Sequence, residues 1–476
     1  MLNLNAKPKM GLLLLASELF HATGEGSKRG AYPQRKQLEA EQMRKDCQEI
    51  AEVSFPGVVS TADDIRHAID VFTADKVDYV LAVYLSWAED FHWARFLRDM
   101  PPCPVLFMNF VHDSIELGDT FIDDEFTACL GYGGLVGALE ASGTATRFNR
   151  PMLVRGTGTW AEILERAKCF GRAARARALL KNAKFGLLAS FNELMWSTYV
   201  DPFSVFSQLG PELHFLPFSE LARYVDEVSD EDAAATMHIL KEKYEVMDDV
   251  EDFKFLASVR ASIGMERMAE AHDLDLLILN DIDNEMCRLI GLRPGFWPTP
   301  SCKGTLIVPE GDVGGGIACY LLKLLGDGHV NYIEPFHIDK PTDTFEAGHA
   351  GPNDYTDPRG KCKIATDVFL SNTPWKYSGA PFGWYTFPTG EMTMLHCSQQ
   401  DGKFQLLTSM IESLPTEHRL ATFSHGRFRP IGQSCAQLFN KLVAVGVTQH
   451  FGIADGDYCK VLEDFATIMG FHHARL

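Results

Sequence analysis

Two glutamates and two histidines, widely separated in the sequence, have side chains that could bind a metal ion. Glu310 lies in a Pro-Glu-Gly-Asp segment, Glu334 follows an apolar run, His349 lies in a Gly-His-Ala-Gly segment, and His450 precedes Phe-Gly. Carboxylate oxygens and imidazole nitrogens suit octahedral Mn²⁺, Mg²⁺ or Co²⁺, whereas a cysteine-rich set would favour structural zinc. Two carboxylates neutralise one divalent ion, so the predicted site suits a neutral polyol.

The position of Glu310 also favours a ligand site. Residues 304–308 are predicted to form a buried strand, and Asp312 is placed to cap a helix over residues 313–325. Ligands of open α/β sheets bind at the carboxyl ends of the strands. The glycines at 314–316 lack the lysine of a phosphate loop, so we expect them to allow close packing of the helix start.

The elements that must position these residues follow a strand and helix alternation. Continuous apolar runs predict buried parallel strands at residues 11–16, 79–85, 105–109, 185–190, 274–280 and 304–308. Apolar residues at helical spacing predict helices near residues 38–50, 65–72, 251–272 and 313–325. Alternation of this kind is typical of doubly wound α/β domains.

Beyond residue 330 the pattern changes to short β-rich runs separated by Gly, Pro and Asn. The runs are 364–370, 392–397 and 404–407, with helices expected at 436–445 and 458–469. We therefore predict two doubly wound, Rossmann-like α/β domains (residues 1–180 and 181–330), followed by a β-rich, barrel-like domain with terminal helices (residues 331–476). An antiparallel sandwich is the alternative to a barrel for the last domain.

Composition narrows the functional class. The 476 residues include 44 Lys+Arg and 64 Asp+Glu, a formal charge of −20, which disfavours nucleic acid as a partner. The apolar run at residues 12–16 is shorter than the roughly 20 residues of a membrane span and shorter than the apolar core of a signal peptide. The eleven cysteines are scattered without a CxxC pair. We expect a cytoplasmic protein with a small-molecule ligand and no membrane partner.

Several segments resemble one known family. Residues 15–20 (Leu-Ala-Ser-Glu-Leu-Phe), 132–135 (Tyr-Gly-Gly-Leu) and 262–267 (Ser-Ile-Gly-Met-Glu-Arg) are similar to segments of the L-arabinose isomerases. The order and approximate spacing of Glu310, Glu334, His349 and His450 also match the Mn²⁺ ligands of that family. The chain thus resembles the L-arabinose isomerases and, more distantly, the L-fucose isomerases, which are metal-dependent enzymes that interconvert aldoses and ketoses.

The resemblance implies a set of roles for individual residues. Glu310, Glu334, His349 and His450 would hold the metal, which is Mn²⁺ in the family, with Mg²⁺ or Co²⁺ as alternatives. Glu310 and Glu334 would act as the acid/base pair. The sugar would contact residues that depart from the family pattern or lie beside it: Glu18, Phe20, Tyr132, Trp297 and Gln449. A homo-oligomer, often a hexamer in this family, is also implied.

The expected reaction is the isomerisation of a pentose or hexose through a cis-enediol. Two other functions stay open. One is an epimerase or an isomerase of a deoxy or acidic sugar, for which Arg147, Arg288 and Arg293 are available to bind an anion. The other is a non-catalytic sugar-binding protein with the same fold, because fold alone does not establish activity.

Overall fold

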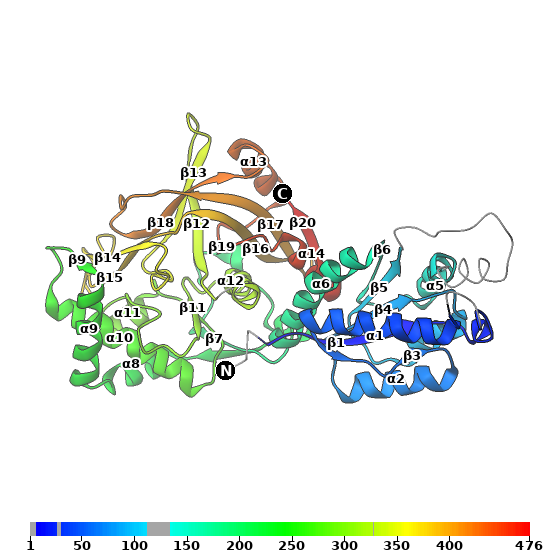
Figure 1. Ribbon diagram of the computed structural model, residues 1–476. Helices are drawn as coiled ribbons and strands as arrows, with labels where there is room; N and C mark the ends of the chain where they lie inside the picture. The colour runs from blue at the N-terminus through cyan, green and yellow to red at the C-terminus, as the bar shows by residue number, and fades with distance from the viewer. Residues whose placement is uncertain (1–5, 26–29, 112–133, 327) are drawn as a thin grey trace. The chain divides into compact units, whose positions relative to one another are not determined.

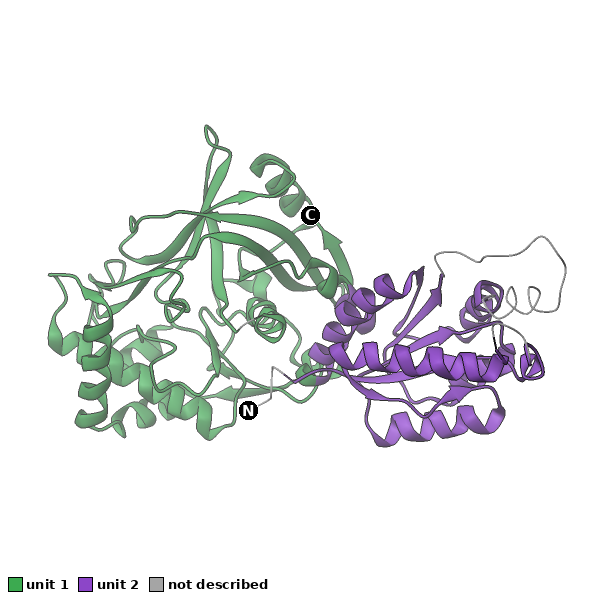
Figure 2. Ribbon diagram, viewed as in Figure 1, with its two compact units in different colours: residues 1–2, 179–463, 471–476 green, residues 3–178, 464–470 purple. Residues whose placement is uncertain are grey.

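The computed structural model describes residues 6–25, 30–111, 134–326 and 328–476. The chain divides into two compact units (Figures 1 and 2). Unit 2 comprises residues 3–178 and 464–470, and unit 1 comprises the remaining residues. The boundary expected between residues 180 and 181 lies close to this division, whereas the predicted boundary after residue 330 falls within unit 1 and stays a prediction.

Unit 2 is built on a parallel six-stranded sheet in which β2, β1, β4, β5 and β6 are neighbours and β3 also pairs with β1. The strands are β1 (Lys9–Leu15), β2 (Glu52–Ser54), β3 (Val58–Val59), β4 (Tyr79–Tyr84), β5 (Val105–Phe110) and β6 (Leu153–Gly158). The helices are η1 (Glu18–Phe20), α1 (Tyr32–Ile50), α2 (Ala62–Ala74), α3 (Asp90–Asp99), α5 (Gly134–Phe148) and the start of α6 (Trp160–Leu180). Every residue of β4 is buried, which explains its continuous apolar sequence.

Unit 1 contains a parallel four-stranded sheet with the order β11, β10, β7, β8. These strands are β7 (Lys184–Leu188), β8 (Glu212–Leu216), β10 (Leu276–Leu279) and β11 (Leu306–Val308). The associated helices are η2 (Trp196–Thr198), α7 (Pro202–Ser204), η3 (Val205–Leu209), α8 (Phe218–Asp226), α9 (Asp230–Lys243), α10 (Asp252–Ala271), α11 (Asn284–Ile290) and α12 (Val313–Leu325). The mixed α/β architecture with parallel sheets is as predicted.

The β-rich region is a barrel rather than a sandwich. Six strands close on themselves in the order β17, β16, β19, β12, β13, β18, because β17 pairs with β18. They are β12 (Asn331–Asp339), β13 (Thr344–Ala350), β16 (Gly390–Gln400), β17 (Lys403–Leu414), β18 (Phe423–Pro430) and β19 (Phe451–Asp455). The short strands β9 (Glu245–Val246), β14 (Lys361–Thr366), β15 (Pro381–Thr386) and β20 (His472–Arg475) extend this sheet. Helices α13 (Cys435–Val445) and α14 (Cys459–Met469) follow the expected positions.

One expected strand is placed differently. Residues 364–370 were predicted as a strand, but β14 ends at Thr366 and residues 368–370 form a turn. The chain leaves the sheet because the side chain of Asp367 is buried against Arg293, with 2.5 Å between Oδ2 and Nη2. A buried ion pair therefore ends the strand, although the apolar residues continue.

Helix α10 explains why the parallel sheet and the barrel form one compact unit. Its residues Phe255, Val259 and Ile263 belong to the core of the barrel. Met265 and Met268 belong instead to the core beneath the parallel sheet. A helix that buries two faces in two cores fixes both layers, so the elements that carry the candidate ligands are held in a common frame.

Candidate metal centre

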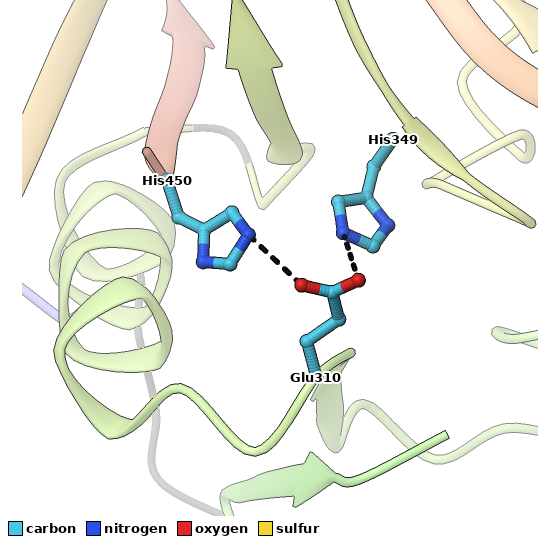
Figure 3. Close-up of side chains that lie close together, drawn as sticks. All are labelled: Glu310, His349 and His450. Carbon is cyan, nitrogen blue, oxygen red and sulfur yellow. Dashed lines mark ion pairs between the residues drawn. The ribbon is translucent and has the colours of Figure 1, made fainter. Parts of the chain in front are cut away.

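Three of the four predicted metal ligands converge in unit 1 (Figure 3). Glu310, His349 and His450 come from three elements, and one ligand atom of each lies within 4.8 Å of the others. Nε2 of His349 is 3.5 Å from Oε1 of Glu310, and Nε2 of His450 is 3.1 Å from Oε2. Both imidazoles are almost fully buried, and the glutamate side chain is 13% exposed.

Glu310 lies just beyond the carboxyl end of β11, the edge strand of the parallel sheet. Its backbone is left-handed, with φ 65°, and Gly311 follows with φ 68°. The backbone N–H of Glu310 donates a hydrogen bond of 2.8 Å to Oδ1 of Asp281, which follows the neighbouring strand β10. This bond turns the chain so that the glutamate side chain points to the two histidines.

Each histidine is oriented by a hydrogen bond at its other ring nitrogen. Nδ1 of His349 donates to the carbonyl of Ala350 at 3.0 Å, and Nδ1 of His450 donates to Oδ2 of Asp312 at 2.9 Å. The carbonyl of His450 accepts a bond of 2.9 Å from His396. Metal-binding histidines usually donate one N–H to a carboxylate or carbonyl in this way, which directs the lone pair of the other nitrogen at the ion.

The inward atoms of the cluster find no hydrogen-bond partner outside it. Oε2 of Glu310 and Nε2 of both His349 and His450 are buried, and their polar contacts are with one another. Buried polar atoms are normally satisfied, so three such atoms facing one point indicate a missing common partner. A divalent cation would coordinate all three, and the donor set fits Mn²⁺, Mg²⁺ or Co²⁺.

The ionisation of the cluster follows from its contacts. Burial opposes ionisation of the Glu310 carboxyl group. The hydrogen bonds and positive charges of His349 and His450 outweigh this effect and hold the pKa of Glu310 well below its usual range. Burial also disfavours the imidazolium of His450, yet hydrogen bonds to Asp312 and Glu310 outweigh it and raise the pKa of His450 to about 9. Without a cation, a proton on His450 therefore supplies the positive charge that the two carboxylates attract.

A buried ion network surrounds the turn that carries Glu310. Arg293 contacts Oδ2 of Asp281 at 3.4 Å and Oδ2 of Asp367 at 2.5 Å, and all three side chains are at most 4% exposed. Together with Glu310 and Asp312, which contact His450, the region holds four carboxylates and one guanidinium. Buried negative charge in excess is costly, and a divalent cation would offset it. Because Arg293 is fully engaged, it is not placed to bind an anionic substrate.

Glu334 is near the cluster but is not part of it. It lies on β12 directly opposite Gly348, the residue before His349, and it is partly buried. Among the described residues, the group of mutually close ligand atoms contains Glu310, His349 and His450 without Glu334. Its roles as fourth ligand and as acid/base group stay predictions.

The predicted sugar-binding residues are distributed over both units. Gln449 precedes His450, and its Nε2 lies 2.9 Å from Sδ of Met195. Trp297 is 3% exposed and belongs to the core beneath the parallel sheet. Glu18 and Phe20 form the short helix η1 of unit 2, where Phe20 packs on Tyr32 with ring centroids 5.5 Å apart. Tyr132 lies outside the described residues.

The sequence did not predict the roles that several residues have in the site. Asp281 orients Glu310, and Asp312 caps α12 through Gly315 as expected but also orients His450. The ring of Tyr332 packs beside both His349 and His450, with centroids 5.0 and 4.7 Å away. The signal that could have revealed Asp281 is its position directly after a buried parallel strand, as for Glu310.

The glycines at the start of α12 serve close packing, as predicted. A Cβ on Gly314 would lie 2.5 Å from the carbonyl oxygen of Cys397, and a Cβ on Gly315 would lie 2.6 Å from Cε2 of Tyr332. Larger residues would separate α12 from the barrel. The glycines therefore bring Asp312 within reach of His450.

No family model matches the chain, and no curated protein matches it. None of the helices formed by the described residues has the length and apolar character needed to cross a membrane. Function is therefore inferred from the geometry of the cluster and from the sequence resemblance.

Proposed function

We propose that the chain is a metal-dependent aldose–ketose isomerase acting on a pentose or hexose. The observation that carries this proposal is the convergence of Glu310, His349 and His450, whose three buried ligand atoms have no hydrogen-bond partner outside the cluster. The surplus of buried carboxylates around them supports a divalent cation of the Mn²⁺, Mg²⁺ or Co²⁺ type. The resemblance to the L-arabinose isomerases supplies the reaction class and the doubly wound form of the two α/β domains.

The protein residues have distinct tasks in this reaction. When bound, the cation would act as a Lewis acid that stabilises negative charge on the sugar oxygens. Glu310, His349 and His450 would hold it, and Asp281, Asp312 and the Ala350 carbonyl keep these ligands oriented. The low pKa of Glu310 keeps this carboxylate ionised, as a metal ligand must be.

Proton transfer through a cis-enediol requires a proton to move from C2 to C1 of the sugar and another to move between O1 and O2. We assign these transfers to Glu310 and Glu334. A positioned acid or base of this kind contributes about 10²- to 10⁴-fold in rate. Among the predicted sugar-binding residues, Gln449 directly precedes the metal ligand His450. We therefore assign Gln449 to sugar binding.

The test is a screen for sugar conversion. Protein treated with EDTA and then supplied with Mn²⁺ is incubated with aldoses that differ in configuration from C3 to C6, in D₂O, and products are identified by NMR. We expect a ketose carrying solvent deuterium at C1, and loss of activity in Glu310→Gln but not in Glu391→Gln, which changes an exposed glutamate of β16.

Other products identify the alternative functions. An epimer would indicate an epimerase, and retention of the substrate hydrogen would indicate a hydride shift in place of the enediol. Binding of one metal ion per chain without conversion of any sugar would favour a non-catalytic sugar-binding protein. Full activity in Glu310→Gln would contradict the assignment of the site.

A further inference from the structure

A separate cavity of about 580 Å³ lies in unit 1 along the outer edge of β11. Its walls are formed by residues 297–300, 302 and 304–309, by Cys319 and Lys323 of α12, and by the segments around Val330 and Asn353. The volume is within the range of small-molecule sites. None of Glu310, His349 or His450 lines it, but Tyr332 forms a wall of this cavity and also packs on both histidines.

Two polar side chains of the cavity, Asp354 and Asn353, already have hydrogen-bond partners within the protein. Oδ2 of Asp354 is 2.8 Å from Nδ1 of His329, and its Oδ1 accepts a bond of 2.5 Å from Thr356. The amide of Asn353 binds both backbone groups of Tyr332, at 2.7 and 3.1 Å. The amide of Asn353 is thus fixed on Tyr332, and the carboxylate of Asp354 is paired with the imidazole of His329.

Donors, by contrast, remain available. The ammonium group of Lys323 donates to the carbonyl of Gly304, and an ammonium has three N–H donors. Lys243 is exposed at the cavity, with its Nζ 5.1 Å from the ring centroid of Tyr244. Among the residues that the structure describes, neither lysine forms an ion pair with a carboxylate. Burial lowers the pKa of Lys323, although the negative charges of Cys302, Asp354 and Asp275 act in the opposite direction.

We propose that this cavity binds a small organic anion, a phosphate monoester or a carboxylate, whose oxygens accept hydrogen bonds from Lys323 and Lys243. The apolar walls formed by Trp297, Pro300 and Val330 contact the body of the ligand. The whole chain carries a charge of −20, which disfavours unspecific binding of anions. Anion binding is therefore expected where lysines are local neighbours, as at this cavity. This site uses none of the metal ligands, so its test is separate from that of the proposed isomerase function, although Trp297 is also a predicted sugar-binding residue.

The test is calorimetric titration of EDTA-treated full-length protein with three anions: inorganic phosphate, glycerol 3-phosphate and citrate. Glycerol is the neutral control. We expect one anion site per chain and no binding of glycerol. Binding of the phosphates without citrate identifies a phosphate site, and the reverse identifies a carboxylate site.

Variants locate the site. Lys323→Met keeps the apolar stem, removes the charge and is expected to weaken binding at least about tenfold, the loss of one charge-assisted contact. Lys243→Met changes an exposed residue, so it reports on the site even where Lys323→Met does not fold. Lys361→Met, which alters an exposed lysine of β14, is the matched control. The proposal is overturned if none of the anions binds, or if they bind Lys243→Met and folded Lys323→Met as tightly as the wild type.

Discussion

Glu310 has a backbone conformation that residues with a side chain seldom adopt. A left-handed residue other than glycine costs on the order of 1–2 kcal/mol, and it persists where neighbouring contacts compensate. Here the compensation is the hydrogen bond from its N–H to Asp281, which Arg293 in turn holds in place. The left-handed backbone directs the carboxylate of Glu310 between the two imidazoles.

Removing Asp281 should therefore weaken metal binding without removing a ligand. Replacement of residues that orient ligands typically lowers metal affinity about 10- to 100-fold. We expect a loss of this size for Asp281→Ala in Mn²⁺ titration, and a smaller loss for Asp281→Asn, which keeps an acceptor oxygen. Asp283→Asn, at the N-cap of α11, is the control. Wild-type affinity in Asp281→Ala would show that Asp281 does not position Glu310.

Glu266 gives a prediction about stability and pH. Burial raises its pKa to about 7, although Thr299 donates hydrogen bonds to both carboxylate oxygens. A folded-state pKa above the unfolded value means that the folded protein binds the proton more tightly. Protonated Glu266 thus makes its full contribution to the free energy of unfolding below about pH 4.5. This contribution, roughly 3 kcal/mol, is lost as the pH rises through 7.

Urea unfolding of the wild type and Glu266→Gln at pH 5 and pH 8 checks this expectation. The wild type should lose more stability than the variant between the two values, because glutamine does not ionise. Glu270→Gln, a partly exposed change on the same helix, should behave as the wild type. Equal pH dependence in the wild type and Glu266→Gln would contradict the raised pKa.

Helix α12 shows how an element contributes to the site. Asp312 at its N-terminus orients His450, and its glycines allow the helix to approach the barrel and Tyr332. A methyl group on Gly315 would overlap the Tyr332 ring, and overpacking of this kind typically costs about 1–3 kcal/mol. The spacing between this helix and the barrel is therefore a condition for the cluster.

We expect Gly315→Ala to lower both the unfolding free energy and the Mn²⁺ affinity. Gly143→Ala in α5 is the matched control, because a Cβ there would meet no atom within 4 Å and alanine favours a helix interior by about 0.5–1 kcal/mol. The midpoint temperature of thermal unfolding should thus fall for Gly315→Ala and rise for Gly143→Ala. A Gly315→Ala protein as stable as the wild type would show that α12 can move away without loss.

The elements could be predicted to different extents. Strands β1, β4 and β10 are continuous apolar runs, and α12 has a clear cap, so the sequence was sufficient to locate them. Closure of the barrel also depends on strands far apart in the sequence, because β12 pairs with β19 and β13 with β18, and local periodicity does not encode such pairings. The end of β14 was missed because it depends on the contact of Asp367 with Arg293, two residues far apart in the sequence.

The candidate site was predicted in part for a similar reason. Glu310, His349 and His450 were identified from residue type and family resemblance, and the structure brings them together. Asp281 and Tyr332 act through hydrogen bonding and packing across elements. The position of Asp281 after a buried strand is a usable signal, whereas no local pattern marks Tyr332. Arg293 was considered as an anion-binding residue, whereas its burial and two carboxylate partners give it a structural role.

For the whole molecule, we predict a homo-oligomer. Unit 1 exposes more than half of the side chains of Leu194, Trp196, Phe203 and Phe206, which lie within one short stretch of sequence. Exposed apolar groups of this size are typical of protein interfaces. Light scattering should give a mass of at least two chains. A mass of six chains would agree with the family resemblance.

Variants can assign the interface. Trp196→Lys combined with Phe203→Lys should reduce the mass, whereas Val443→Lys, at another exposed apolar position, should not. A monomeric wild type would contradict the prediction, and an unchanged mass in the double variant would place the interface elsewhere.

The central claim is that Glu310, His349 and His450 bind one divalent cation, and titration of EDTA-treated protein with Mn²⁺, followed by electron paramagnetic resonance of the free ion, tests it most directly. We predict one ion per chain in the wild type and in His238→Ala, an exposed histidine, and loss of that site in Glu310→Gln and His349→Ala. A wild type that binds neither Mn²⁺ nor Mg²⁺ nor Co²⁺, or a folded Glu310→Gln variant that binds Mn²⁺ with unchanged affinity, would contradict the claim.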